Sequence, residues 1–287
     1  MGESRPFCQP RPGRLCSRRT GGNDVAGYIL DQRWERESER LDALERCCDP
    51  LTVTQLERTG VAPGWRCLEV GAGHGSIARW LAAQVGVHGA VLAIDLDTTL
   101  LEPHRGPRLE VRRLDILSDP LPAEAFDLIH ARHVLGHLSD RAGALHRLAG
   151  ALRPRGWMVI EDFDYGWLEL GEWPCAPADH GAMLARVWGA AIEAMRAGSY
   201  DGAWARRLPA AMRAAGLDAV AGEVRALVDD RAFADCMRLS VLRLREQVLA
   251  QGVPAAEIDR CSEVLIDPGT CVVAAPLVSV RGRRPPD

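Results

Sequence analysis

The sequence predicts an α/β fold with a mostly parallel sheet of seven strands and helices on both of its faces. Short apolar segments of strand length alternate with helical patterns from residue 66 onward. The connections between these segments are long enough for helical crossovers, which join parallel strands with right-handed geometry. The chain has 287 residues, 47% of them hydrophobic, and no linker rich in Pro, Gly or Ser divides it. We therefore expect one domain built on one large sheet.

Seven segments have the apolar composition and the flanking turn residues of buried strands. They are residues 66–70, 90–94, 109–112, 125–130, 157–160, 219–228 and 271–280. The intervening helices show apolar residues at a spacing of three or four. They are expected at residues 77–85, 139–152, 181–196, 203–215, 232–248 and 254–265.

The first 60 residues contain a tail followed by a helical segment. Residues 1–27 hold five arginines among Pro, Gly and Ser with no apolar period, which predicts a disordered basic tail. Leu41 and Leu44 recur at helical spacing in residues 28–60. Pro50 interrupts this pattern, so we expect two helices that meet there.

Charge and cysteine content exclude several classes of function. All 35 basic residues are arginine, which rules out lysine nucleophiles, Schiff bases and the lysine of a phosphate-binding P-loop. A net charge of −4 without a basic stripe argues against nucleic acid as a partner. The nine cysteines form no C-x-x-C pair and no zinc spacing with histidine, so no metal site is expected. With no long apolar run and no secretory signal, we expect a cytoplasmic protein without a membrane partner.

The most specific motif is LEVGAGHGS, which follows the first strand and leads into a helix. Gly71 and Gly73 allow a sharp turn and let a ligand lie against backbone N–H groups. A dinucleotide-binding loop would carry a third glycine at position 76, where this chain has Ser76. Glu69 precedes Gly71 by two residues. Its carboxylate would repel a pyrophosphate but suits a ligand with ammonium and sulfonium charges.

Two further acids end the next two strands. Asp95 stands 26 residues after Glu69, where it can accept both hydroxyls of a ribose or else cap a loop. Asp115 closes the third strand and precedes Ile116. Its carboxylate can accept from an adenine amino group while Ile116 packs on the ring, or it can serve as a turn residue.

These segments, in this order, resemble the class I S-adenosylmethionine-dependent methyltransferases over about residues 28–282. LEVGAGHGSIARWLA matches the first motif of the family, AIDLD its ribose-binding acid and RRLDIL its adenine-binding segment. FDLIHARHVLGHL and LRPRGWMVIEDFD match the fourth and fifth strands, and the resemblance is strongest to the branch that modifies small molecules in bacterial metabolism. It implies a Rossmann-like fold with S-adenosylmethionine as the cofactor. The positions it implies for cofactor binding are Tyr28, Glu69, Gly71, Ala72, Gly73, Ser76, Asp95, Leu96, Asp115, Ile116, Ala131, Arg132 and His137.

The resemblance also divides the chain. After the tail, residues 28–282 are expected to form a single methyltransferase domain, and residues 283–287 to be frayed. Within the domain we expect a helical cap over residues 28–60, a cofactor-binding core over 61–165 and a substrate and lid region over 166–270. The helices of residues 231–266 lie between the last two strands. Together with the N-terminal helices they are expected to form the lid.

Methyl transfer from a sulfonium is an in-line displacement, so holding the reactants at near-attack distance can supply much of the catalysis. An oxygen or nitrogen nucleophile can also need a base. His133 and Asp164 are the predicted catalytic residues, and His137 is expected to pack and to support the cofactor. The aromatic stretch of residues 163–173 is interpreted either as the wall of a substrate pocket or as packing on the sheet.

The leading hypothesis is therefore a methyltransferase of secondary metabolism that acts on a small molecule, with a hydroxyl as the expected acceptor. One alternative keeps the fold and the cofactor without the transfer, as in a cyclase-like or binding protein. A nicotinamide-dependent oxidoreductase is a further alternative, disfavoured by Ser76 and Glu69. The sequence leaves the substrate open, and also whether the protein forms a homodimer.

Overall fold

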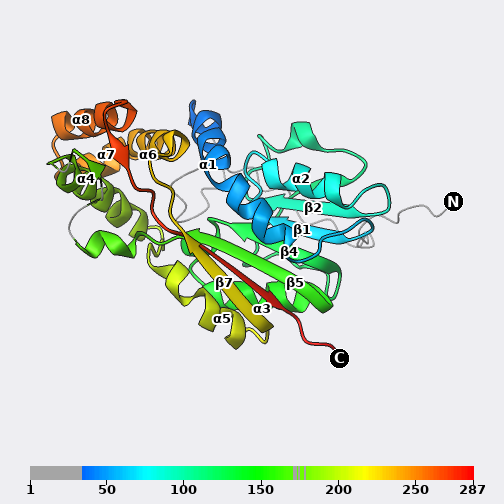
Figure 1. Ribbon diagram of the computed structural model, residues 1–287. Coiled ribbons are helices and arrows are strands. Elements are labelled where there is room, and N and C mark those ends of the chain that lie inside the picture. Colours follow the sequence, from blue (N-terminus) through cyan, green and yellow to red (C-terminus); the bar gives the residue numbers. More distant parts are fainter. Residues whose placement is uncertain (1–33, 171–172, 174, 178) are drawn as a thin grey trace, which may run out of the picture.

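The computed structural model describes residues 34–287 except residues 171, 172, 174 and 178. Seven strands form one sheet in the order β3-β2-β1-β4-β5-β9-β7 (Figure 1). The strands β1 to β5 run parallel, and β9 is antiparallel to both β5 and β7. This confirms the predicted α/β fold with a mostly parallel sheet. Their bounds are β1 Arg66–Val70, β2 Ala90–Asp95, β3 Leu109–Arg113, β4 Phe126–Arg132, β5 Leu152–Phe163, β7 Asp218–Arg225 and β9 Leu277–Arg283.

Helices cover both faces of the sheet (Figure 1). The helices α1 and α2 pack on one face around Leu56, Leu81 and Val159, and α3 and α5 pack on the other around Leu148 and Met212. The remaining helices α4, α6, α7 and α8 gather beyond one end of the sheet. Their bounds are α1 Glu37–Glu57, α2 Ser76–Gln84, α3 Arg141–Ala151, α4 Asp179–Arg196, α5 Leu208–Ala214, α6 Arg231–Arg243, α7 Arg245–Ala250 and α8 Ala255–Ile266.

The last predicted strand, residues 271–280, is divided in two. Residues Cys271–Val272 form β8, which pairs antiparallel with β6 (Cys175–Ala176) outside the main sheet. The sheet strand β9 begins at Leu277, directly after Pro276, which has no N–H for a strand hydrogen bond. At its other end β9 reaches Arg283, and Arg284 exchanges backbone hydrogen bonds with Arg155 and Gly156. The chain is therefore hydrogen-bonded two residues into the segment expected to be frayed.

Helix α1 is continuous, so the predicted break at Pro50 is wrong. A proline inside a helix removes one backbone hydrogen bond and costs about 3 kcal/mol. The flanking turns are held by tertiary contacts, because Cys47, Cys48 and Leu56 are buried beneath the helix. Packing on the sheet thus overrides the local preference of the sequence.

The sheet face beneath α1 carries a row of polar side chains. Glu69 on β1 is in register with His130 on β4, and Glu161 on β5 is in register with Ser279 on β9. All four residues are buried. Apart from Asp162, their neighbours along the strands are apolar residues of the opposite face, as the two-residue period of a strand requires. We call Glu69, His130, Glu161 and Ser279 the polar row.

Polar residues of α1 meet this face of the sheet. The hydroxyl of Thr52 donates to Glu161, and the side-chain amide of Gln55 donates to Glu223 on β7 at 3.1 Å. Arg58, one turn further, forms an ion pair with Glu223. The apolar pattern of α1 is weak for this reason, because much of the buried side of the helix is polar.

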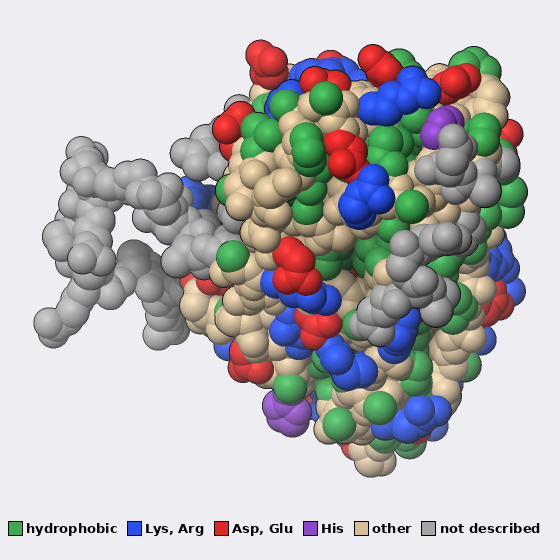
Figure 2. Space-filling model, turned by 90° about the vertical axis from the view of Figure 1, so that its left-hand side faces the viewer, with side chains coloured by type: hydrophobic (Ala, Val, Ile, Leu, Met, Phe, Trp, Pro, Cys, Tyr) green, Lys and Arg blue, Asp and Glu red, His purple; other side chains and the backbone are tan. Residues whose placement is uncertain are grey.

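The helices beyond the end of the sheet have a hydrophobic core of their own. Trp173 lies in this core, and its ring centroid is 6.2 Å from that of Trp188 and 6.2 Å from that of Phe233. The aromatic residues Phe163 and Trp173 are buried here, which favours the packing interpretation of that stretch over a pocket wall. Figure 2 shows this end of the molecule, where Arg, Asp and Glu side chains are scattered between hydrophobic ones. Across the part of the chain that the structure describes, no helix is long and apolar enough to cross a membrane.

Candidate functional site

A cavity of about 990 Å³ lies at the carboxyl ends of β1 to β4, between the sheet edge and α1. Ligands bind at this edge in open α/β sheets because the loops that follow the strands converge there. The cavity brings together twelve of the residues predicted for cofactor binding or catalysis. They are Glu69, Gly71, Ala72, Gly73, Ser76, Asp95, Leu96, Asp115, Ile116, Arg132, His133 and His137.

The glycine-rich loop after β1 forms the floor of the cavity. Gly71 and Gly73 have φ angles of +65° and +55°, which side chains other than glycine rarely adopt. A Cβ atom on Gly71 would lie 2.2 Å from Cγ2 of Val134. The backbone therefore approaches its neighbours as closely as the motif predicts, and only glycine fits at position 71.

Asp95 joins this loop to the end of β2. Its Oδ2 accepts from the N–H of Gly73 at 2.9 Å, and its Oδ1 accepts from the N–H of Asp97 at 3.1 Å. Burial raises the pKa of Asp95, although these backbone donors oppose the shift. Each carboxylate oxygen has a second lone pair, so the side chain can still accept hydroxyl groups from the cavity that it lines.

Asp115 lines the cavity and also closes a turn. Its Oδ1 accepts from the N–H of Leu117 at 2.8 Å, and its Oδ2 accepts from the hydroxyl of Ser118 at 3.1 Å. The turn role left open by the sequence is thus present. The neighbouring Ile116 also lines the cavity, as a residue that packs on a planar ring would.

Acidic residues of α1 bind the first turn of α2. The N–H of Ser76 donates to Glu45 at 3.1 Å, and its hydroxyl donates to Asp49 at 3.1 Å. Carboxylates at a helix N-terminus satisfy free N–H groups and oppose the helix dipole. Arg132, at the end of β4, donates to Asp49 at 2.9 Å and to Thr52 at 2.8 Å. Helix α1 is therefore fixed to both the glycine-rich loop and the sheet.

Glu69 contacts His130, its neighbour in the polar row. Both of its oxygens lie within 2.9 Å of Nδ1 of His130, whose Nε2 lies 3.3 Å from Glu161. Burial disfavours the charged imidazole, but the two carboxylates outweigh it and raise the pKa of His130 to about 9. Burial also raises the pKa of Glu69. The imidazole is therefore a cation at neutral pH, held between two carboxyl groups.

His133 is held in a strained conformation at the end of β4. Its φ is +55°, a backbone conformation that costs a non-glycine residue free energy. The ring stacks on Phe163 at 4.5 Å, Nδ1 lies 3.6 Å from Oδ1 of Asp162, and Nε2 lies 3.7 Å from Sγ of Cys48. Burial opposes protonation of His133, but Asp162 and Cys48 raise its pKa overall. Asp162 is itself fixed by the N–H of Gly136 at 3.1 Å.

The sequence of the core decides the family. Residues 32–236 match the model of a family described as a methyltransferase domain. This chain belongs to that methyltransferase family.

Relatives agree with the assignment, and solved structures share the fold. The methyltransferase Str2 of Strobilurus tenacellus is 35% identical over 140 residues, 48% of this chain and 49% of that protein. The chain spans about half the length of the curated relatives that it matches. The [4+2]-cyclase SpnF shares the fold with a TM-score of 0.54 and 19% identity, over 84% of this chain and 82% of the cyclase. A phosphoethanolamine N-methyltransferase 2 of Haemonchus contortus, in complex with phosphomonomethylethanolamine and S-adenosylhomocysteine, has a TM-score of 0.56 and 17% identity, over 90% and 59% of the two chains.

Of the predicted site residues of the methyltransferase, two do not line the cavity and one is not described. Tyr28 lies outside the described residues. Ala131 is fully buried on the opposite sheet face, because it alternates with the cavity-lining Arg132. Asp164 lies past the end of β5, where Arg206 and the N–H of Gly166 bind its carboxylate. The acid beside His133 is Asp162 instead.

His137 packs within the protein at the edge of the cavity, and its support of the cofactor stays a prediction. It lines the cavity in the short 3-10 turn Leu135–His137, and its ring packs on Tyr200 with centroids 4.5 Å apart. Burial, with the positive charges nearby, lowers the pKa of His137 to about 3. A histidine that stays neutral throughout the physiological range suits packing better than proton transfer.

Of the helices expected to form a lid, α1 lines the cavity and the helices of residues 231–266 do not. Residues of α1 line the cavity, among them Leu41, Leu44 and Glu45. Residues 231–266 form α6, α7 and α8, all of which are described, but none of their side chains lines it. Their apolar stripes bury one another in the core around Trp173.

Sequence reasoning missed His130 and Glu161, which complete the polar row. The signal was present, because each is an ionisable residue that directly follows an apolar run within a strand, where charged side chains are rare unless paired. It also missed the α1 residues, since their pattern identified a helix without showing which side faced the sheet.

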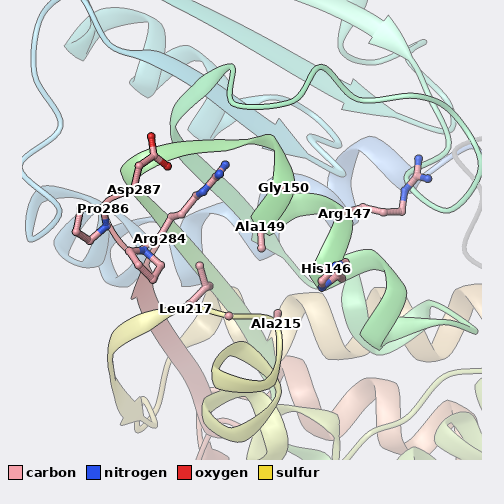
Figure 3. Close-up of a pocket in the computed structure, with 11 residues that line it drawn as sticks. His146, Arg147, Ala149, Gly150, Ala215, Leu217, Arg284, Pro286 and Asp287 are labelled. Atoms are coloured by element: carbon pink, nitrogen blue, oxygen red, sulfur yellow. The ribbon is translucent and has the colours of Figure 1, made fainter.

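A second pocket lies away from the carboxyl ends of the parallel strands, at the other end of the sheet (Figure 3). It has a volume of about 580 Å³ and lies between the end of α3, the turn at Ala215–Leu217 and the C-terminal residues from Arg284. None of the predicted site residues lines it. Most of the predicted site residues that the structure describes gather at the larger of these two cavities.

Proposed function

We propose that this methyltransferase transfers a methyl group from S-adenosylmethionine to a hydroxyl of a small molecule. The observation that carries the proposal is the meeting of the glycine-rich loop, Glu69, Asp95 and His133 in one cavity. These residues supply a place for a cationic nucleoside and a base beside it.

The cavity fits the cofactor by the chemistry of its groups. The positive φ angles of Gly71 and Gly73 give the sharp turn expected where a ligand lies against backbone. Glu69 would hold the ammonium group, Asp95 the ribose hydroxyls, and Asp115 with Ile116 the adenine. When bound, S-adenosylmethionine supplies an electrophilic methyl group.

His133 would accept the proton of the acceptor hydroxyl. Asp162 faces Nδ1, which favours the proton on that nitrogen and leaves Nε2 as the acceptor. Nε2 faces Cys48, whose thiol pKa is raised well above its ordinary value by a hydrogen bond with Cys47 and by burial. A neutral thiol is a weak donor, so an acceptor hydroxyl can replace it at Nε2.

The size and the lining of the cavity suit a small acceptor. The cavity has the volume typical of small-molecule sites and lies under α1. Lining residues on α1 include the apolar Leu41 and Leu44 and the paired Arg40 and Glu37. These side chains suit a compact, partly polar molecule.

The test is calorimetry with S-adenosylhomocysteine and with NAD, followed by turnover with S-adenosylmethionine and a panel of small hydroxylated compounds. We expect S-adenosylhomocysteine to bind and a methylated product to appear together with S-adenosylhomocysteine. Binding of NAD in place of S-adenosylhomocysteine would overturn the proposal.

A second candidate is a cyclase-like protein that binds the cofactor without using it. The fold likeness to the [4+2]-cyclase SpnF favours it, as does the contact of both His133 nitrogens with protein groups. Cofactor binding with no methylated product from any acceptor class would support this candidate over methyl transfer.

A further inference from the structure

We propose that His130 positions the carboxylate of Glu69 and that its proton competes with the ammonium group of the cofactor for that carboxylate. The inference rests on the proposed function, because it needs a cationic ligand at Glu69. It assigns a role to a histidine that lies outside the cavity and touches no ligand.

The geometry fixes Glu69 through one contact. Nδ1 of His130 lies 2.8 Å from Oε2 and 2.9 Å from Oε1 of Glu69, so the imidazole faces both oxygens at once. Among the described residues, His130 is the hydrogen-bonding partner that the structure gives to this carboxylate. Glu69 lines the cavity, and its remaining lone pairs are available to a ligand there.

Glu161 on the other side of His130 is engaged by other donors. It accepts hydrogen bonds from Thr52 on α1 and Ser279 on β9, in addition to the contact with His130. Neither hydroxyl titrates in the relevant range. The titratable groups that face His130 are therefore Glu69 from β1 and Glu161 from β5, with the positive charge of Arg132 near both carboxylates.

The charges of this cluster couple the proton to the ligand. Two carboxylates hold one imidazolium, and a ligand ammonium at Glu69 would add a second cation to the same carboxylate. Each cation then weakens the binding of the other, and this coupling is reciprocal. Burial lowers the pKa of His130, but the two carboxylates outweigh it and raise that pKa to about 9, so the proton is present at neutral pH when the ligand arrives.

The test compares two ligands on the whole protein. S-adenosylhomocysteine carries the ammonium group, whereas 5′-methylthioadenosine has the same adenine and ribose without it. The pKa of His130 is measured by NMR of the histidine rings in the free protein and with each ligand. We expect S-adenosylhomocysteine to lower that pKa by about one unit, a tenfold loss of proton affinity, and methylthioadenosine to leave it unchanged.

Calorimetry at pH 7.5 in buffers of different ionisation enthalpy gives a second readout. We expect proton release when S-adenosylhomocysteine binds and none with methylthioadenosine. The amine of the ligand can only take up protons, so a release must come from the protein.

The variant His130→Gln assigns the NMR signal and should abolish the release. His88→Gln, at an exposed position, is the matched control. It should keep the NMR signal of His130 and the proton release. If His130→Gln does not fold, the comparison of the two ligands on the unaltered protein still decides the question. Binding of S-adenosylhomocysteine without release and without a pKa change would overturn this inference alone, whereas failure of both ligands to bind would overturn the proposed function.

Discussion

Arg132 on β4 donates a hydrogen bond to Asp49 on α1 at 2.9 Å. The guanidinium side chain is 9% exposed, so its charge is neutralised inside the protein rather than by water. The same Asp49 oxygen accepts from the hydroxyl of Ser76 in the first turn of α2. One carboxylate thus ties the covering helix to the sheet and to the loop that forms the floor of the cavity.

Asp49→Ala should loosen α1. Removing Asp49 leaves the nearly buried Arg132 uncompensated, so we expect a loss of about 1–3 kcal/mol in the free energy of unfolding. Urea denaturation measures it. The control is Asp42→Ala, which removes an exposed pair with Arg46 and should cost less than about 0.5 kcal/mol. Equal losses in the two variants would contradict the role given to Asp49.

Gly71→Ala should abolish binding of S-adenosylhomocysteine. The added Cβ atom would lie 2.2 Å from Val134 at a φ of +65°, so both the loop and its neighbour would have to move. Calorimetry measures the affinity. Gly150→Ala at the end of α3 meets no atom within 4 Å and is the matched control. There the change should be neutral or stabilise the fold by up to about 1 kcal/mol.

Asp95→Ala should weaken cofactor binding by about 1–3 kcal/mol, because the ribose would lose a charged acceptor. The neighbouring Asp97→Ala distinguishes this role from a general effect of charge, since Asp97 accepts from Thr99 within its own loop. We expect a much smaller change in the dissociation constant for Asp97→Ala. An unchanged affinity in Asp95→Ala would show that the acid has been misassigned.

His133→Gln should lower kcat by about 10²–10⁴-fold if His133 is the base, with little change in cofactor affinity. Asp162→Asn should have a smaller effect on kcat and move the pH profile. Asp162 helps to raise the pKa of His133, and a base works only when it is unprotonated. Loss of Asp162 therefore lowers that pKa and shifts the rising limb of the pH–rate curve to lower pH. A profile that stays in place would contradict the pairing.

The fold should lose stability as the pH rises toward 9. The pKa of His130 is raised to about 9 from the ordinary 6.5, so the folded state binds this proton more tightly than the unfolded state does. Its contribution is complete below about pH 6.5 and disappears as the pH passes about 9, with a total of up to about 3 kcal/mol. Urea denaturation across this range measures it. His130→Gln should show a flatter dependence over the same interval.

The sequence by itself determined the succession of strands and helices along the chain, the glycine-rich loop and the acids at the strand ends. These features depend on local patterns, because a glycine cluster after an apolar strand produces the same turn wherever the strand lies. Twelve of the predicted residues accordingly line one cavity. The edge of the sheet on which a ligand would bind followed from the parallel order alone.

Only the tertiary structure decided the partners of those residues. Glu69 and His130 are 61 residues apart and meet because β1 and β4 are in register, which no local pattern encodes. Asp162, rather than Asp164, accompanies His133 because β5 ends at Phe163 and the chain then turns toward Arg206. Pro50 stays inside α1 because contacts with the sheet outweigh its local cost. In each case the free energy that decides comes from packing between distant segments, which becomes defined only when the chain is folded.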